Sequence, residues 1–241
     1  MRSILAFALP ALALALPASL DIEFEPPNPS EISIIDTAHS GNGCPQGTVS
    51  TLISDDRTIV TFGFDAFQVY TGPNTVPSDR SKNCQIHLKL NYPGGFQYSV
   101  VQATYHGYAR LDPEVTGTFF SSYFFSTDPT QTASSRISIT GDDWLDGNIY
   151  TKADEVDNAS VVWSPCGAEG MLNINNRIAL TSRDTNAAGE LSNDDATVAF
   201  QQQAYIQWRP CTNEKTGKRH EPEDVFDLGD VDSEIWPGTK A

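Results

Sequence analysis

Hydrophobic residues recur at every second position in many short segments of this chain. In segment 84–90 (CQIHLKL), Ile86, Leu88 and Leu90 share one face of an extended chain, and polar residues occupy most of the alternate positions. Segment 171–182 repeats this alternation. No segment of the sequence shows the 3.6-residue period of an amphipathic helix. The pattern therefore predicts strands that are buried on one side.

These segments are separated by turns rich in Gly, Pro, Asn and Asp. Strands are expected at 31–38, 48–53, 58–64, 67–71, 84–90, 96–111, 116–126, 135–140, 148–152, 160–164, 171–182 and 197–209. Half-buried antiparallel strands show this alternation, whereas strands of a buried parallel sheet do not. We therefore expect an all-β fold in which two antiparallel sheets pack as a jelly-roll-like β-sandwich.

The strand pattern is limited to the middle of the chain, which divides the sequence into four parts. Residues 1–18 combine Arg2 with a short apolar run and small residues, as in a cleaved secretory signal peptide. Residues 19–30, rich in Pro and acidic residues, are expected to form an extended lead-in. Residues 31–211 are the predicted sandwich domain. Residues 212–241 hold eight acidic and four basic residues, which predicts a disordered acidic tail.

The acidic tail contains a dibasic pair, Lys218 and Arg219. Proteases of the secretory pathway cut after such pairs, but an exposed pair in a solvated tail also arises by chance. A trimmed tail and an intact tail are therefore both open, and the intact mass of the secreted protein distinguishes them.

The charge of the chain excludes some classes of partner. Its 241 residues include 15 Lys and Arg against 31 Asp and Glu, a net charge of −16. Such a surface repels phosphate backbones and anionic lipids, so we expect neither nucleic acid nor a membrane as a partner. No second long apolar run follows the signal peptide. We expect a secreted, extracellular protein that is a monomer.

Export changes how the four cysteines are interpreted. Cys44, Cys84, Cys166 and Cys211 form an even set for an oxidising compartment, and no C-x-x-C pair points to zinc. Three pairings are open. We favour Cys44 with Cys84 and Cys166 with Cys211, because each bond then closes a loop of about 40 residues and stabilises the fold by roughly 4 kcal/mol.

Four stretches together resemble a known family. They are GNGCPQGTVS (41–50), NCQIHLKLNYPGGFQYSV (83–100), CGAEGMLNINNRIALTS (166–182) and YIQWRPC (205–211). In order and spacing they are similar to the secreted, largely fungal proteins catalogued as domain of unknown function 4360. The resemblance covers about residues 31–211. It implies export, a β-rich domain and disulfides at these cysteines, and it implies no activity and no catalytic residue.

Segment 141–148 (GDDWLDGN) is the strongest candidate for a binding site. Its Trp144 lies among Asp142, Asp143 and Asp146 between two predicted strands. An aromatic ring stacks on the apolar side of a sugar, and carboxylates accept hydrogen bonds from its hydroxyl groups. The other interpretation, which is favoured over a binding site, is a hairpin turn whose Trp packs back onto the sheet.

Glutamines supply a second, weaker indication of sugar binding. Gln97 and the run 201–203 place amides on predicted strands. Exposed amides hydrogen-bond to sugar hydroxyls, but they also form the ordinary wet side of a sandwich.

The remaining motifs point to no cofactor and no metal. Segment 141–148 lacks the spacing of an EF-hand, and neither G-x-S-x-G nor G-x-G-x-x-G occurs. His87 and His106 lie on predicted strands in surroundings typical of a polar strand face and an aromatic cluster. Asn158 begins an Asn-Ala-Ser sequon, which predicts N-glycosylation in an exported chain.

These observations favour a non-catalytic extracellular protein that binds a glycan at a cell wall or host surface. A polysaccharide hydrolase is the alternative, but the many carboxylates, such as Asp65, Asp112 and Glu114, contain no marked pair. A protein-binding effector or a structural wall protein is the third hypothesis. Whether the protein is an enzyme stays open, with binding favoured.

Overall fold

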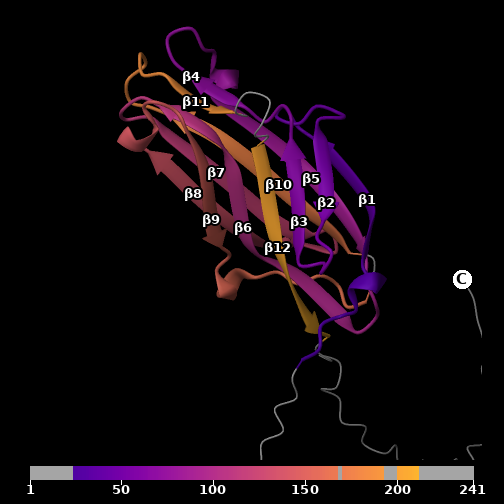
Figure 1. The fold of residues 1–241 in the computed structure, drawn as a ribbon. Coiled ribbons are helices and arrows are strands. Elements are labelled where there is room, and N and C mark those ends of the chain that lie inside the picture. The colour runs from indigo at the N-terminus through magenta and orange to yellow at the C-terminus, as the bar shows by residue number, and fades with distance from the viewer. Residues whose placement is uncertain (1–23, 168–169, 193–199, 212–241) are drawn as a thin grey trace, which may run out of the picture. The chain divides into compact units, whose positions relative to one another are not determined.

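The computed structural model of the chain describes residues 24–167, 170–192 and 200–211. In these residues two antiparallel sheets pack together (Figure 1), which confirms the predicted all-β sandwich. The predicted signal peptide (1–18) and acidic tail (212–241) lie outside the described residues, as does the start of the lead-in. Among the described residues, no helix is long and apolar enough to cross a membrane.

The first sheet, here sheet A, has five strands. Their order across the sheet is β1 (Ser33–Ser40), β5 (Ser81–Asn91), β10 (Met171–Thr181), β7 (Thr116–Phe125) and β8 (Asp128–Thr140). All neighbouring pairs are antiparallel.

The second sheet, here sheet B, has seven strands. Its main path is β2 (Val49–Ile53), β3 (Ile59–Phe64), β12 (Phe200–Pro210), β6 (Phe96–Leu111), β11 (Gly189–Ser192) and β4 (Val69–Thr71). A further strand, β9 (Asn148–Glu155), pairs with β6. Short 3-10 helices occur at η1 (Pro29–Glu31), η2 (Pro77–Asp79), η3 (Asp142–Trp144) and η4 (Asn158–Ser160).

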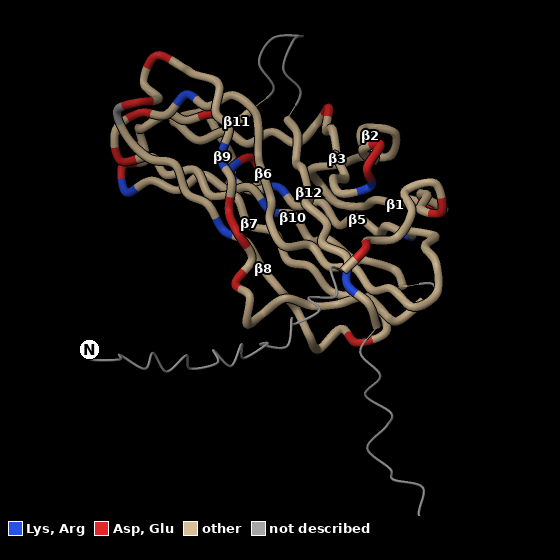
Figure 2. Tube along the Cα trace, turned by 60° about the horizontal axis from the view of Figure 1, so that its bottom comes forward, with Lys and Arg blue, Asp and Glu red and all other residues tan. Residues whose placement is uncertain are grey.

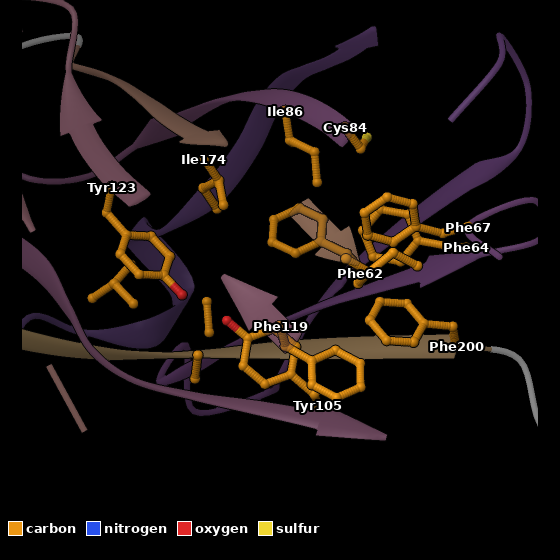
Figure 3. Close-up of a cluster of buried hydrophobic side chains, with 14 of the residues drawn as sticks. Phe62, Phe64, Phe67, Cys84, Ile86, Tyr105, Phe119, Tyr123, Ile174 and Phe200 are labelled. Atoms are coloured by element: carbon orange, nitrogen blue, oxygen red, sulfur yellow. The ribbon is translucent and has the colours of Figure 1, made fainter. Parts of the chain in front are cut away.

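The two-residue alternation places the apolar side chains between the sheets. In β5, Ile86, Leu88 and Leu90 are buried while the residues between them are partly exposed. Aromatic rings fill much of the interior (Figure 3). Phe200 of β12 lies 5.5 Å from Phe64 and 6.1 Å from Phe119, measured between ring centroids, and so joins the two sheets.

A buried polar cluster also connects the sheets. Gln202 of sheet B accepts a hydrogen bond from the Asn176 amide of sheet A at 2.5 Å and donates to Ser121 Oγ at 3.0 Å. Tyr105 of sheet B donates to Ser121 Oγ at 2.6 Å. Burial raises the pKa of Tyr105 and, more strongly, that of Tyr123. Because hydrogen bonds depend on direction, this cluster restricts how the sheets can slide past each other.

Both favoured disulfides are present. Cys44 is bonded to Cys84 with a Cα–Cα distance of 5.5 Å, and Cys166 to Cys211 with a Cα–Cα distance of 5.6 Å. The first bond attaches the connection after β1 to β5, and the second attaches the segment before β10 to the end of β12.

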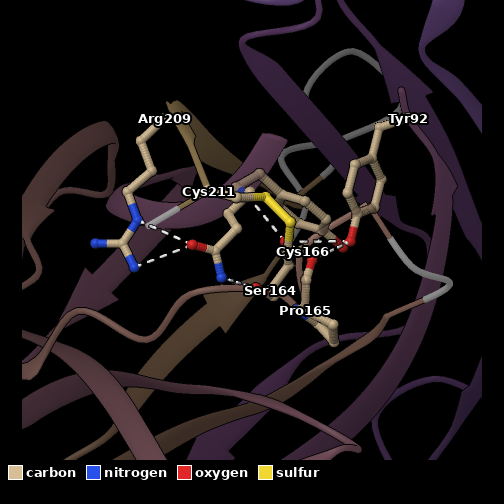
Figure 4. Close-up of a disulfide and its surroundings, with 8 residues drawn as sticks. Tyr92, Ser164, Pro165, Cys166, Arg209 and Cys211 are labelled. Atoms are coloured by element: carbon tan, nitrogen blue, oxygen red, sulfur yellow. Dashed lines mark hydrogen bonds between the residues drawn. A yellow bond between two sulfur atoms is a disulfide. The ribbon is translucent and has the colours of Figure 1, made fainter. Parts of the chain in front are cut away.

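The segment 161–167 corrects one expectation about the strands. Residues 160–164 were expected to form a strand, but the structure has no strand there. Instead Ser164 Oγ accepts the backbone N–H of Tyr98 at 3.0 Å, and Ser164 O accepts from the Gln97 side chain at 2.6 Å (Figure 4). Ser164 N–H also donates to Tyr98 O at 2.8 Å, so backbone and side-chain hydrogen bonds together hold this segment against β6 without a regular strand.

Candidate functional site

The pairing between β6 and β12 is irregular at one point. Tyr205 pairs with Gln102, whereas the next residue, Ile206, pairs with Val100, so Val101 is an extra residue on β6. A bulge of this kind bends the strand and redirects its side chains. The bulge therefore produces local relief on an otherwise continuous sheet.

A groove of about 450 Å³ lies over this bulge. We call it the β6–β12 groove, and its lining residues are Thr58, Val101, Gln102, Glu155, Val156, Asn158, Tyr205, Ile206 and Gln207. Apolar side chains supply part of the lining, and polar side chains from three strands, one loop and η4 supply the rest. The groove thus combines apolar contact area with directional hydrogen-bonding groups.

The polar groups of the groove are an aromatic hydroxyl, amides and one carboxylate. Tyr205 is partly exposed, and its hydroxyl donates to Gln203 Oε1 at 3.3 Å, which favours one orientation of the ring. The amides of Gln102 and Gln207 can each donate and accept, whereas Glu155 accepts when it is ionised. Such a set complements a ligand that carries many hydroxyl groups.

Uncharged polar groups continue along sheet B beyond the groove. Gln201 and Gln203 are partly exposed, whereas Gln202 between them is fully buried. Gln201 pairs with His106, whose Nδ1 lies 2.7 Å from Thr151 Oγ1. The outer face of β12 therefore extends the hydrogen-bonding surface of the groove toward Gln201.

Acidic residues of β9 lie at and beside the groove. Asp154 accepts the backbone N–H of Arg136 in sheet A at 2.6 Å, so it is held away from Glu155, the only acidic residue in the groove lining among the described residues. Elsewhere, a hydrogen bond from Thr130 is the main cause that lowers the pKa of Asp128. A general acid for glycoside hydrolysis needs a raised pKa and a second carboxylate at a set distance. The groove lining itself supplies one carboxylate, that of Glu155.

Comparison with known families confirms the resemblance seen in the sequence. The family described as domain of unknown function (DUF4360) matches residues 30–211. The chain belongs to the DUF4360 family. An uncharacterized secreted protein of Arthroderma benhamiae is 44% identical over 187 residues, which cover 78% of this chain and 75% of that protein.

Two solved structures are similar to this DUF4360 protein at low scores. TmCBM61 in complex with β-1,4-galactotriose has 10% identity and a TM-score of 0.24, and covers 77% of this chain and 94% of its own. The family 11 carbohydrate-binding module of Clostridium thermocellum, in complex with a β-1,3-1,4-mixed-linked tetrasaccharide, has 10% identity and a TM-score of 0.20, and covers 73% and 93%. At these TM-scores the likeness carries no argument about function.

The segment around Trp144 of the DUF4360 domain packs against sheet B. Trp144 ends η3 with 9% of its surface exposed, and its ring lies edge-on to Tyr150 at 6.2 Å. Lys152 Nζ lies 5.8 Å from the centroid of the indole. These contacts give Trp144 a packing role, which matches the turn alternative.

The aspartates predicted beside Trp144 lie in the same turn. Asp142 begins η3, and Asp143 and Asp146 are exposed. A sugar that stacked on the indole would compete with Tyr150 and Lys152 for the ring. The glycan role of these four residues stays a prediction, which the Trp144 variant below tests.

Asn158 and the groove residues complete the comparison with the sequence expectations. Asn158 is exposed at η4 and lines the groove, so its sequon is accessible in the DUF4360 domain. Tyr205, Gln102 and Glu155 were missed as a site because they lie far apart in the sequence. One signal was available: the two-residue alternation of β12 separates Gln201 and Gln203 from Gln202.

Proposed function

We propose that this protein is exported and binds a neutral polysaccharide in the β6–β12 groove without cleaving it. The observation that carries the proposal is the combination of a partly exposed Tyr205 with amides and a single lining carboxylate. The tyrosine ring supplies a stacking surface for the apolar side of a sugar ring, and Gln102 and Gln207 supply donors and acceptors for its hydroxyl groups.

Export is supported independently of the groove. The relative from Arthroderma benhamiae is named a secreted protein. Two disulfides in a chain of this kind fit an oxidising compartment. An exported protein meets the polysaccharides of cell walls and cell surfaces, which are therefore available as ligands.

The test is calorimetric titration of the full secreted chain with soluble β-glucan, galactan and mannan fragments. We expect Tyr205→Ala to weaken binding by about tenfold or more, because truncation of a central aromatic removes a dominant contact. Tyr205→Phe keeps the ring and should stay within about threefold of the unaltered protein. Tyr70→Ala is the matched control, since Tyr70 is a 38% exposed tyrosine elsewhere on sheet B.

Two outcomes would overturn the proposal. Binding that survives Tyr205→Ala unchanged would remove the groove as the site. Release of new reducing ends from the same polysaccharides by the pure protein would establish hydrolysis in place of binding alone.

A further inference from the structure

A second surface lies on the outer face of sheet A. Arg177 of β10 pairs with Phe120 of β7, and Phe120 pairs with Arg136 of β8, so the three side chains form one row across the strands. We call it the Arg–Phe–Arg row. Phe120 is 37% exposed, and both arginines are exposed. Directly opposed residues have Cβ atoms about 5 Å apart, so the two arginine side chains start on either side of the ring.

The guanidinium groups of this row are available to a ligand. Arg177 Nε donates to Ser81 Oγ of β5 at 3.0 Å, a neutral contact on the side of β10 opposite Phe120, and a ligand carboxylate can replace it. The Asp154 carboxylate accepts a hydrogen bond from the backbone N–H of Arg136 and not from its guanidinium. No carboxylate of the described residues forms an ion pair with either guanidinium, in contrast to Arg110, which lies 3.7 Å from Glu190.

The charge of sheet A differs from that of the whole chain. The three central strands β5, β10 and β7 contain no Asp or Glu, although the chain has 31 such residues. The two edge strands add one acidic residue each, Asp36 in β1 and Asp128 in β8. In Figure 2 the acidic positions lie mainly in loops and at strand ends. The row therefore faces solvent as a local cationic site on an acidic protein.

Neutral polar groups flank the row on the same face. Asn175 of β10 pairs with Gln85 of β5 and with Ser122 of β7, and Ser122 pairs with Ser134 of β8. This second row is two residues from the first along β10, a rise of about 7 Å. Amides and hydroxyls at this position can hydrogen-bond to the hydroxyl groups of a ligand that lies on Phe120.

We propose that the Arg–Phe–Arg row binds a polyuronate, a polysaccharide whose sugar rings carry carboxylates. The apolar side of a pyranose stacks on Phe120. A uronate carboxylate is attached directly to its ring, so it reaches the neighbouring guanidinium, whose planar fork matches a carboxylate through two hydrogen bonds. The second arginine binds the carboxylate of an adjacent sugar. This site shares no residue with the β6–β12 groove, so either proposal can fail alone.

The test is binding of the full chain to polygalacturonate, compared with its methyl ester and with polyphosphate. We expect binding to polygalacturonate at low ionic strength, with little binding to the methyl ester. The double variant Arg136→Gln with Arg177→Gln should weaken polygalacturonate binding by about tenfold or more, and Phe120→Ala should have the same effect. Arg183→Gln, on an exposed loop position, is the charge-matched control for each single substitution, Arg136→Gln and Arg177→Gln, and Tyr205→Ala should leave polygalacturonate binding unchanged.

Three outcomes would overturn the proposal. Equal binding of the methyl ester would show that carboxylates are not recognised. Polyphosphate binding as tight as polygalacturonate binding, with no loss in Phe120→Ala, would reduce the row to a general anion surface. Loss of binding in Arg183→Gln equal to that in Arg136→Gln and in Arg177→Gln would show a charge effect of the whole chain. Thermal melting of every variant verifies that the fold is kept.

Discussion

The outer faces of the two sheets differ in chemistry, although their inner faces are alike. The strands of sheet B carry three cations and three acids, namely Arg110, Lys152, Arg209, Asp154, Glu155 and Glu190. The strands of sheet A carry four cations and two acids, namely Lys82, Lys89, Arg136, Arg177, Asp36 and Asp128. Among the described residues, close packing restricts most inner positions of both sheets to apolar residues or hydrogen-bonded polar ones, with the buried hydroxyls of Tyr98 and Tyr150 as exceptions. Outward positions have no such restriction, so one fold presents an amide-rich groove and a cationic row.

The largest expected effects come from removing the two disulfides, because each bond closes a long loop and so restricts the unfolded chain. Each bond also attaches to a different sheet. Cys166→Ser with Cys211→Ser should lower the free energy of unfolding by about 4 kcal/mol, as should Cys44→Ser with Cys84→Ser. Urea unfolding at equilibrium measures both. The bond between Cys166 and Cys211 attaches β12, so its loss should also weaken binding at the β6–β12 groove. Binding at the Arg–Phe–Arg row should be unchanged. Equal weakening at both surfaces would show that neither disulfide acts locally.

Trp144→Ala should lower the free energy of unfolding by about 3 kcal/mol, because it removes a ring that is nine-tenths buried against Tyr150. Glycan binding at the groove should be unchanged. Calorimetric titration and urea unfolding of the same preparation give both values. Loss of glycan binding with full stability would transfer the site to Trp144 and its neighbouring aspartates.

Gln202→Ala should lower the free energy of unfolding by about 2 kcal/mol, because it leaves the Asn176 amide buried without its acceptor. The matched controls are Gln201→Ala and Gln203→Ala, which flank it on the outer face and should change stability by about 0.5 kcal/mol or less. These controls should weaken glycan binding instead. A stability loss of the same size at all three positions would contradict the separation of inner and outer faces.

Salt should distinguish the two surfaces. Raising NaCl shortens the Debye length from about 10 Å at 0.1 M to about 3 Å at 1 M. Polygalacturonate binding should therefore fall by about tenfold over this range, while binding of a neutral polysaccharide should change by about twofold or less. Titrations at both ionic strengths measure this. A parallel fall for both ligands would mean that they share one charged site.

The smallest effect is expected at Asn158, which lines the groove. If its sequon is occupied, the attached glycan lies at the groove and competes with an added polysaccharide. Asn158→Gln should then reduce the mass of the secreted protein and strengthen groove binding by about twofold to threefold. Ser160→Ala removes the sequon by another residue and should act identically. A mass unchanged by both substitutions would show that the site carries no glycan.

Much of the fold followed from local patterns in the chain. The strand at 84–90 and the pairing of the cysteines were predicted because alternation and loop length are properties of nearby residues. The strand expected at 160–164 was wrong because the segment's contacts are with Gln97 and Tyr98, more than 60 residues away. Whether a short apolar segment forms a strand or an irregular segment thus depends on partners that are distant in the sequence.

The candidate sites were less predictable than the fold. Trp144 among aspartates is a sugar-like pattern in the sequence, yet the tertiary structure packs the ring against Tyr150. The groove joins Tyr205 to Gln102 through a bulge in the pairing of β12 with β6, and register is a relation between strands. The spacing of residues within either strand therefore does not predict this groove.

By itself, the order of apolar and polar residues determined that this protein is a β-sandwich, because a period of two leaves one buried face on most of its strands. Tertiary structure alone decided which polar residues meet on the outer faces. The physical reason is that burial can be recognised residue by residue, whereas a binding surface arises from strands that are distant in sequence and adjacent in a sheet.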